Sequence, residues 1–300
     1  MTLNIWLILD GKRGHEKQIE DLAFCITKRT KTKIIKIKKN NILHVFFNFI
    51  SIGNDPCKSF PLPDFIIASG HQTHFDAIQK KNRYGGKLII IMKPSLPSFL
   101  FDLIIMPSHD KKKNGNNIFV INNSINKITN LGKQRKNSGL FLIGGPSRNF
   151  YWSSEKVIDK IKKIVQMNPD INFSITTSRR TPDDFFDFFE EELKEKIYIY
   201  NYKDLSSDWI DKIIGSFEYS WVTQDSISMV SEMISAGSKV TCISLDKKNL
   251  KFKKFYNDLY DEKKINLSDK KEQKVIISKN QKSTADICAD FIFKYFNIKR

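Results

Sequence analysis

The chain has 300 residues, which is more than one hydrophobic core usually fills, so its length predicts two domains. Lys and Arg number 50 against 33 for Asp and Glu, and the formal net charge of +17 calls for nucleic acid, an acidic membrane surface or a phosphate-bearing small molecule as a partner. With 40% hydrophobic and 28% charged residues, the composition excludes disorder over most of the chain.

The cysteine pattern and the N-terminus point to a reduced compartment. The four cysteines form no C-x-x-C pair and have no His at ligand spacing, so we expect neither structural zinc nor a disulfide framework. The apolar run 5–9 is ended by Asp10, which makes it too short for a signal peptide, and no uncharged run of about 18 residues could span a bilayer. We therefore expect a cytoplasmic protein.

Short apolar runs alternate with amphipathic stretches along the chain, which is typical of parallel sheets covered by helices. In the first half this pattern predicts a helix over 15–28 and strands over 3–9, 33–37, 64–68, 87–92 and 102–106. The polar stretch that follows is rich in Asn, Lys and Ser, and we assign 126–138 as a linker between a domain of residues 1–125 and a domain of residues 139–300.

A second series of the same kind follows the linker. It predicts strands over 140–143, 172–176, 197–200, 219–223 and 239–244, and helices over 154–165, 182–193, 205–214 and 226–236. Apolar residues at helical spacing over 283–296 predict a terminal helix, which could pack back on the first domain. Between about 247 and 282 the chain is rich in lysine and the pattern weakens. The sequence thus predicts two α/β domains in tandem.

Ligands of open α/β sheets bind beyond the carboxyl ends of the strands, so the loops that follow strands are the best candidates for a site. Residues 10–18 follow the first strand, and Gly11 and Gly14 allow a close backbone approach to an anion at the start of a helix. The G-x-x-G spacing is not a dinucleotide fingerprint, and no Gly-Lys-Ser/Thr follows as in a P-loop. A polar turn with glycines for tight packing explains the segment equally well.

Two further strand ends of the first domain carry polar residues. Ser69, Gly70 and Thr73 follow the third strand. His109 and Asp110 follow the fifth, where a His beside an Asp can act as an oriented base. A single histidine is usually a surface or core residue, but His or Asp follows the first, third and fifth strands of this domain, at Asp10, His71 and His109, which favours a site at this edge.

The second domain also carries polar residues after its strands. Backbone N–H groups at Gly144 and Gly145, after the first strand, suit a diphosphate. The next loop offers hydroxyl and guanidinium groups, which suit phosphate oxygens, at Ser178, Arg179, Arg180 and Thr181. Adjacent arginines more often form a solvated face, although a position between a buried strand and a helix start leaves them less free to do so.

Residues 223–232 run from a strand into a helix, and Asp225 or Ser226 is expected to cap that helix. Glu232 lies about two turns into the helix on an otherwise apolar stretch, where an unpaired carboxylate would be costly. We therefore expect Glu232 to accept hydrogen bonds from the diol of a ribose.

The motifs, in this order and spacing, resemble those of the mitochondrial-fission "elongated mitochondria" family, which also has many bacterial members. They read D-G-K-R-G-H-E-x-Q, S-G-H-x-T, P-S-H-D, L-I-G-G, T-x-S-R-R-T-P and V-T-x-D-S-x-S-M-x-S-E. The likeness extends to about Ser244, and the last two motifs are specific. His71 departs from the pattern, because Arg is commoner at that position.

The resemblance implies a B-type glycosyltransferase-like fold, with two Rossmann-like domains facing across a cleft, similar to the transferase that adds N-acetylglucosamine to lipid-linked peptidoglycan precursors. In such enzymes the C-terminal domain holds the nucleotide sugar and the N-terminal domain receives the acceptor and provides the base. The expected reaction is an inverting transfer to a lipid-linked or other cell-envelope acceptor, with the nucleotide sugar as a substrate and with neither cofactor nor metal. A non-catalytic scaffold that keeps the fold and a sugar-nucleotide epimerase are the alternatives.

On this basis we assign three groups of candidate site residues. The base is one of Asp10, His15 and Asp110. The donor nucleotide is expected at Gly144, Gly145, Ser178, Arg179, Arg180, Thr181, Thr223, Asp225, Ser226, Met229 and Glu232. The acceptor or a phosphate is expected at Gly11, Gly14, Gln18, Ser69, Gly70, Thr73 and His109.

A strongly apolar segment, Ile42 to Ile50, follows the lysine-rich residues 31–39. This arrangement suits a helix lying on an anionic membrane, here the inner face of the cell membrane, although a helix packed on the sheet is the commoner explanation. Nucleic acid is not expected as a partner, because no zinc finger, ribonucleoprotein motif or helix-turn-helix pattern is present and the lysines are spread along the chain.

Overall fold

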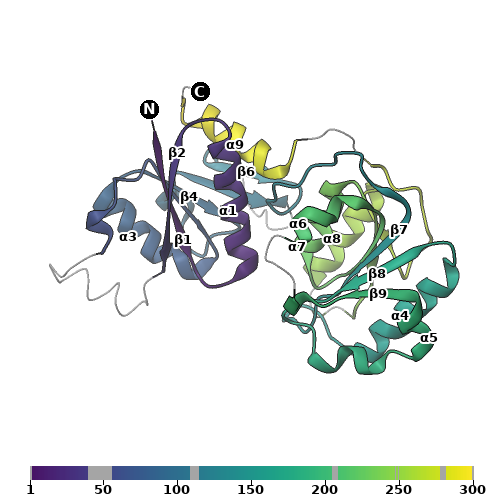
Figure 1. The fold of residues 1–300 in the computed structure, drawn as a ribbon. Helices are drawn as coiled ribbons and strands as arrows, with labels where there is room; N and C mark the ends of the chain where they lie inside the picture. The colour runs from purple at the N-terminus through teal and green to yellow at the C-terminus, as the bar shows by residue number, and fades with distance from the viewer. Residues whose placement is uncertain are drawn as a thin grey trace. The chain divides into compact units, whose positions relative to one another are not determined.

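The computed structural model describes residues 2–39, 56–108, 115–204, 209–246, 248, 250–277 and 282–298. The chain divides into two compact units, Met1–Lys127 with Lys282–Arg300, and Ile128–Gln281. In its described part each unit contains a parallel six-stranded sheet with helices packed against it (Figure 1). These two sheets confirm the predicted α/β fold with two Rossmann-like domains.

The first unit has the strand order β2-β1-β3-β4-β5-β6. Its strands are β1 (Leu3–Leu9), β2 (Thr32–Lys38), β3 (Phe65–Ser69), β4 (Lys87–Ile91), β5 (Leu103–Pro107) and β6 (Ile118–Ile121). Its helices are α1 (Arg13–Thr27), α3 (His74–Tyr84) and α9 (Thr284–Tyr295). Because successive residues of a strand face opposite sides, Ile5 and Leu7 of β1 pack with α1 and α9. Trp6 and Ile8 pack on the other face, with α3.

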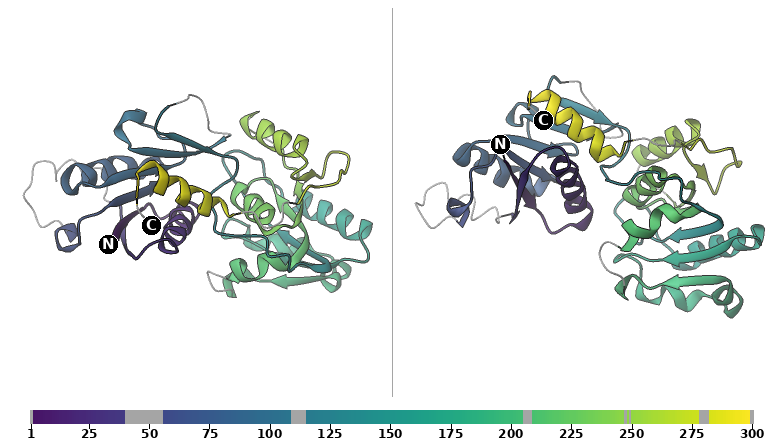
Figure 2. Two further views of the ribbon diagram at one scale, coloured as in Figure 1. Left: turned by 90° about the horizontal axis from the view of Figure 1, so that it is seen from above. Right: turned by 45° about the horizontal axis from the view of Figure 1, so that its top comes forward.

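The C-terminal helix belongs to the first unit, where α9 lies beside α1 (Figure 2). Arg29, just beyond α1, donates hydrogen bonds to Asp286 Oδ1 at 3.0 Å and Asp290 Oδ1 at 2.9 Å, both on α9. Phe291 of α9 stacks on Phe119 of β6 with ring centroids 3.9 Å apart. Ion pairs and an aromatic stack therefore hold α9 on the sheet of the first unit.

The second unit has the strand order β12-β11-β10-β7-β8-β9, again with parallel neighbours. Its strands are β7 (Arg135–Leu142), β8 (Asn172–Thr176), β9 (Ile197–Tyr200), β10 (Phe217–Thr223), β11 (Lys239–Ile243) and β12 (Asn266–Leu267). Its helices are α4 (Ser154–Met167), α5 (Glu191–Lys196), α6 (Trp209–Ile213), α7 (Ile227–Ala236) and α8 (Leu250–Asp261). The central strands β7 and β10 are buried over their carboxyl-terminal halves, which fixes the position of the loops that follow them.

Several elements differ from the sequence prediction, and the short strands β6 and β12 were not predicted at all. Strand β7 begins at Arg135, inside the segment expected as linker, because its first three residues are exposed and polar and hide the strand pattern. The helix predicted over 182–193 is a 3-10 helix, Asp183–Phe188, followed by the short α5. Helix α8 was missed because its many lysines weaken the pattern, although Tyr256 is fully buried. Across the described ranges, no helix has the length and apolar run needed to cross a membrane.

Candidate functional site

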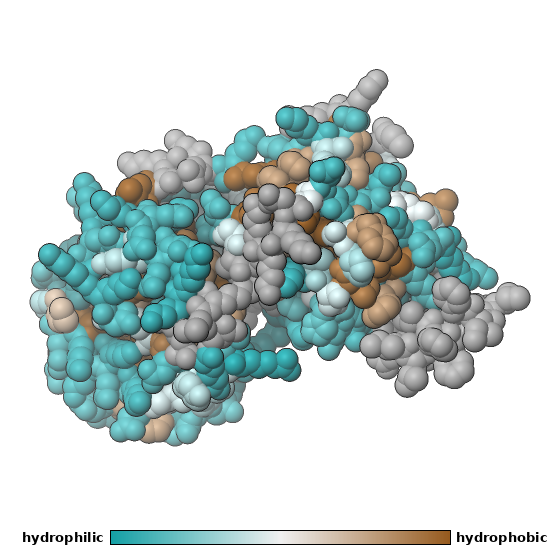
Figure 3. Space-filling model, turned by 180° about the vertical axis from the view of Figure 1, so that it is seen from behind, coloured by the Kyte–Doolittle hydropathy of each residue, from teal (hydrophilic) through white to brown (hydrophobic). Residues whose placement is uncertain are grey.

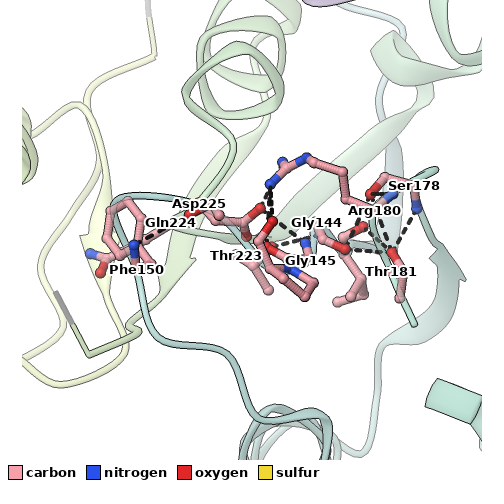
Figure 4. Close-up of polar contacts among 12 residues, drawn as sticks. Gly144, Gly145, Phe150, Ser178, Arg180, Thr181, Thr223, Gln224 and Asp225 are labelled. Carbon is pink, nitrogen blue, oxygen red and sulfur yellow. Dashed lines mark hydrogen bonds and ion pairs between the residues drawn. The ribbon is translucent and has the colours of Figure 1, made fainter. Parts of the chain in front are cut away.

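In the second unit, the loops after β7, β8 and β10 meet at the carboxyl edge of the sheet (Figure 4). Strand β7 lies between β10 and β8, so its loop contacts both neighbours. The Gly144 N–H donates to Thr223 Oγ1 at 2.7 Å, from the β10 side. On the β8 side, Ser178 Oγ donates to the Gly144 carbonyl at 3.1 Å, and the Thr181 hydroxyl donates to the same carbonyl. The predicted donor-binding loops are thus one hydrogen-bonded group.

The glycine turn does not present bare N–H groups, which corrects one expectation from the sequence. The Gly145 N–H donates to Asp225 Oδ2 at 3.0 Å, and the Gly144 N–H is taken by Thr223. A Cβ on Gly144 would overlap the Asp225 carboxylate, and a Cβ on Gly145 would overlap the backbone of Arg180. These glycines are therefore required by the close packing of the three loops.

Asp225 is the centre of this group. Its side chain is 0% exposed, and Arg180 Nη2 lies 2.7 Å from its Oδ2 while 41% of the Arg180 side chain remains exposed. Burial raises the pKa of Asp225 above its ordinary value, against the opposing effects of the Arg180 charge and the Gly145 N–H. Within the described part of the chain, Asp225 Oδ1 has no hydrogen-bond partner.

Helix α7 begins directly after the loop that follows β10. Ser226 is its N-cap residue, but neither the Ser226 side chain nor that of Asp225 caps the described helix, because Asp225 is held by Gly145 and Arg180. The first N–H groups of a helix have no intrahelical partner, so the start of α7 can receive an anion. Met229 packs against the core, and Glu232 is buried on the same helix.

The remaining candidate of this unit, Arg179, is exposed beside the group. It forms no hydrogen bond or ion pair with any residue that the structure describes. A free guanidinium in a loop at the carboxyl edge of the sheet is suited to a phosphate.

In the first unit, Asp10 at the end of β1 pairs with His15 in the first turn of α1. His15 Nδ1 lies 2.8 Å from Asp10 Oδ2, and Asp10 is 1% exposed against 21% for His15. A carboxylate only accepts hydrogen bonds, so His15 Nδ1 carries the proton and Nε2 is left as the basic nitrogen. Asp10 Oδ1 also accepts from the Lys12 N–H at 3.0 Å, which fixes the carboxylate.

Gly70 follows the neighbouring strand β3 and packs closely against the Asp10–His15 pair. Its φ of +86° is a left-handed conformation that favours glycine. A Cβ at this position would lie 2.7 Å from His15 Cε1 and 3.0 Å from Asp10 Oδ2. The loops after β1 and β3 therefore meet around the His15 ring, as expected for adjacent parallel strands.

The other candidates of the first unit have structural contacts in the same loops. The Gly11 N–H donates to Glu16 Oε1 at 3.0 Å, and Gln18 Nε2 donates to the Gly14 carbonyl at 3.0 Å. Thr73 is fully buried and donates to the Gly70 carbonyl at 2.8 Å. Ser69 is also buried. His109 and Asp110 lie outside the described residues, as does the apolar segment 42–50.

The sequence matches the family model described as Mitochondrial fission ELM1 over residues 13–295. The chain belongs to this family. An uncharacterized protein of Rickettsia prowazekii (strain Madrid E), RP120, is 27% identical over 320 aligned positions, which cover 87% of this chain and 89% of the relative.

Solved structures share the fold of this ELM1-family chain at low identity. The UDP-GlcNAc 2-epimerase from Methanocaldococcus jannaschii has a TM-score of 0.59 at 13% identity, with full coverage of both chains. Phytolacca americana UGT2, complexed with UDP-2fluoro-glucose and pterostilbene, has a TM-score of 0.53 at 10% identity, covering 97% of this chain and 89% of that one. The fold is thus that of B-type glycosyltransferases and UDP-sugar epimerases.

Sequence reasoning missed one polar pair of the ELM1-family chain. His74 is buried at the start of α3, and its Nδ1 lies 3.1 Å from Ser95 Oγ in the loop after β4. Burial lowers the pKa of His74 to about 4, so this ring is neutral at physiological pH. The signal in the sequence was a histidine four positions after the strand-end glycine Gly70, but nothing there identified Ser95 as its partner.

Proposed function

We propose that this chain is an inverting glycosyltransferase that uses a nucleotide sugar, with the donor bound by the second unit and the acceptor by the first. The observation that carries the proposal is the Asp10–His15 pair, in which a buried carboxylate orients an imidazole at the carboxyl edge of a Rossmann-like sheet. Support for the donor comes from the two structural neighbours described above, whose names both contain UDP sugars.

In the proposed reaction, His15 Nε2 takes the proton of an acceptor hydroxyl as that oxygen attacks the anomeric carbon of the sugar. The bond from the anomeric carbon to the nucleoside diphosphate breaks, and the diphosphate leaves with the bonding electrons. Asp10 stabilises the imidazolium that forms. The start of α7 and the free Arg179 side chain offset the charge on the leaving diphosphate.

Two buried carboxylates of the second unit have different parts in this scheme. Asp225 positions the loops, because it holds the Gly145 N–H and the Arg180 guanidinium. Glu232, buried on α7, is proposed to accept hydrogen bonds from the ribose of the donor. The proposal requires no metal, since cationic side chains and a helix start supply positive charge at the diphosphate.

An epimerase is the second candidate function, and the likeness to the M. jannaschii epimerase favours it. An epimerase would act on the nucleotide sugar itself and would need no acceptor. The two functions therefore differ in whether a second substrate is consumed.

Thermal unfolding in the presence of UDP-, GDP-, CMP- and ADP-linked sugars tests the donor site. We expect one nucleotide class to raise the Tm of the wild type, and Arg179→Ala and Glu232→Ala to reduce that shift. Lys163→Ala is the matched control for Arg179, because Lys163 is exposed on α4 and outside the site. If no nucleotide sugar raises the Tm at millimolar concentration, the assignment of the donor site is wrong and a non-catalytic scaffold becomes the better hypothesis.

Product analysis with the nucleotide that binds separates the two enzymatic functions. Mass spectrometry should show loss of the nucleotide sugar only when an acceptor extract is added. Conversion of the donor to an epimer without any acceptor would show that the protein is an epimerase and that the transferase proposal is wrong.

We also propose that the protein works in the cytoplasm on an acceptor held at a membrane surface. The segment 42–50 that first suggested this lies outside the described residues. Support comes from exposed aromatic side chains on the first unit, where Phe75 is 55% and Phe99 is 80% exposed. His74, next to Phe75, hydrogen-bonds Ser95 in the loop that leads to Phe99. Figure 3 shows hydrophobic side chains gathered on one face of this unit.

Flotation with phosphatidylglycerol-containing vesicles tests this membrane contact. We expect the wild type to float with the vesicles. The double variant Phe75→Ser/Phe99→Ser should remain in the soluble fraction. The control is Met167→Ser, an equally exposed apolar residue on α4 of the second unit. Equal flotation of all three proteins would exclude this surface as the contact.

A further inference from the structure

The second unit has a hollow at the amino edge of its sheet, opposite the edge that carries Gly145 and Asp225. Its volume is about 570 Å³, which is within the range of small-molecule sites. It is lined by residues at the first positions of four strands, Arg135 of β7, Asn172 of β8, Ile197 of β9 and Phe217 of β10. None of the residues assigned to the proposed reaction lines this hollow.

The rim of the hollow is strongly basic. Its charged residues are one carboxylate, Glu195, and four cations, Arg135, Lys136, Lys194 and Lys196. Among the described residues, Lys194 and Lys196 form ion pairs only with exposed glutamates of α5, and such surface pairs are weak enough to yield to a phosphate. Lys136 forms no ion pair with any described residue. The excess of positive charge favours an anionic ligand.

The lining of the hollow also contains polar and aromatic residues. Residues 174 and 198 are register partners in β8 and β9, so Ser174 lies beside Tyr198 on one face of the sheet. Tyr198 is 65% exposed, and its ring centroid lies 4.7 Å from that of Tyr200 on the same strand. Phe173, which also lines the hollow, and Ile175 alternate with Ser174 along β8 and are buried. This face therefore keeps an aromatic ring in solvent beside cations.

We infer that this hollow binds a phosphate ester that carries a planar ring, the chemistry of a nucleotide. The cations of the rim neutralise the phosphate, and Tyr198 offers its ring for stacking, which is how proteins hold nucleotide bases without a specific hydrogen-bond pattern. The inference goes beyond the proposed function, because the two sites lie at opposite edges of the same sheet. Occupancy of one site does not require the other.

Hydrogen–deuterium exchange of the full chain, with and without millimolar ADP, tests this inference. ADP supplies both a ring and a diphosphate, and inorganic pyrophosphate supplies the anion alone. Exchange in β9 reports on the hollow, whereas exchange at the start of α7 reports on the donor site. We expect ADP to slow exchange in β9 in the wild type and equally in Arg179→Ala, so the two proposals can fail separately.

Three substitutions connect the protection to the residues of the hollow. Lys136→Glu should raise the ADP concentration at half-protection of β9 by roughly tenfold, whereas Lys163→Glu, the same charge change on α4, should leave it unchanged. Tyr198→Ser should weaken the binding of ADP and leave the binding of pyrophosphate unchanged. Tyr198→Phe, which keeps the ring, should bind ADP as the wild type does. The inference is overturned if millimolar ADP leaves β9 unprotected, or if Lys136→Glu and Lys163→Glu have equal effects.

Discussion

Arg180 and Asp225 form an ion pair between the loops that follow β8 and β10, with Arg180 Nη2 2.7 Å from Asp225 Oδ2. The same carboxylate oxygen accepts the Gly145 N–H from the loop between them. One buried carboxylate thus holds the three loops of the candidate donor site. The site is positioned by a charge that the protein must keep compensated, and this makes it sensitive to changes in either partner.

Arg180→Met is expected to lower the free energy of unfolding by about 2 kcal/mol at pH 7, because it leaves the buried Asp225 carboxylate without its cation. Urea unfolding followed by circular dichroism measures this loss. In an Asp225→Asn background the same change should cost much less, since no charge is left uncompensated. Equal costs in both backgrounds would show that the pair does not couple the loops.

The stability of the second unit should also respond to the titration of Asp225. Burial raises the pKa of Asp225 in the folded state above its ordinary value of 3.8, so between pH 3.8 and the folded-state pKa the folded state keeps a proton that the unfolded state has lost. The stability that this group contributes is fully present below pH 3.8 and declines as the pH rises through the folded pKa. Urea unfolding between pH 3.5 and 7 should show that the wild type loses stability relative to Asp225→Asn as the pH rises. Parallel curves would contradict the prediction.

Gly70→Ala is expected to displace His15, because the new Cβ would lie within 3.0 Å of both His15 and Asp10. Gly85→Ala is the matched control, since Gly85 has φ +76° but no atom within 4 Å of its virtual Cβ. Both changes add backbone strain of about 1–2 kcal/mol. Only Gly70→Ala should move the NMR signals of the His15 ring and reduce turnover by roughly 100-fold. A similar effect of both alanines would attribute the loss to strain alone.

How far the sequence predicts this site depends on the distance along the chain between partners. Asp10 and His15 were identified as alternative bases, but the turn at Gly11, with φ +82°, is what brings them together as one pair. The Arg180–Asp225 pair depends on the strand order β10-β7-β8, which a pattern of alternating strands and helices does not specify. The sequence therefore predicted which strand ends carry polar residues, but it did not predict which of these residues pair with one another across neighbouring strands.

His74 should make the first unit sensitive to acid. Its folded-state pKa of about 4 is below the ordinary 6.5, because burial disfavours the charged ring. The unfolded state therefore binds the proton first, and stability falls by about 3 kcal/mol as the pH drops from 6.5 to 4. In His74→Asn, which keeps an acceptor for Ser95, urea unfolding should lose this dependence. His71→Asn, at the exposed neighbour, should retain it.

The ion pairs between Arg29 and α9 should govern how firmly the C-terminal helix is held. The hydrogen bond from Arg29, followed by that from Lys282, lowers the pKa of Asp290 to about 2. This contribution to stability is present above the ordinary value of 3.8 and is lost as the pH falls from there toward 2. Arg29→Met should weaken that acid dependence, leaving the smaller effect of Lys282, and should cost about 3 kcal/mol at pH 7, because two partly buried carboxylates lose the Arg29 cation.

Hydrogen–deuterium exchange of the peptide spanning α9 separates local release of the helix from global unfolding. We expect Arg29→Met to accelerate exchange in α9 well before the sheet of the first unit is affected, because α9 packs on that sheet from the end of the chain. Lys282→Met is the control, since the Lys282 side chain is 68% exposed and an exposed pair contributes less than about 1 kcal/mol. If α9 exchanges at the wild-type rate in Arg29→Met, its apolar face alone is sufficient to hold it in place.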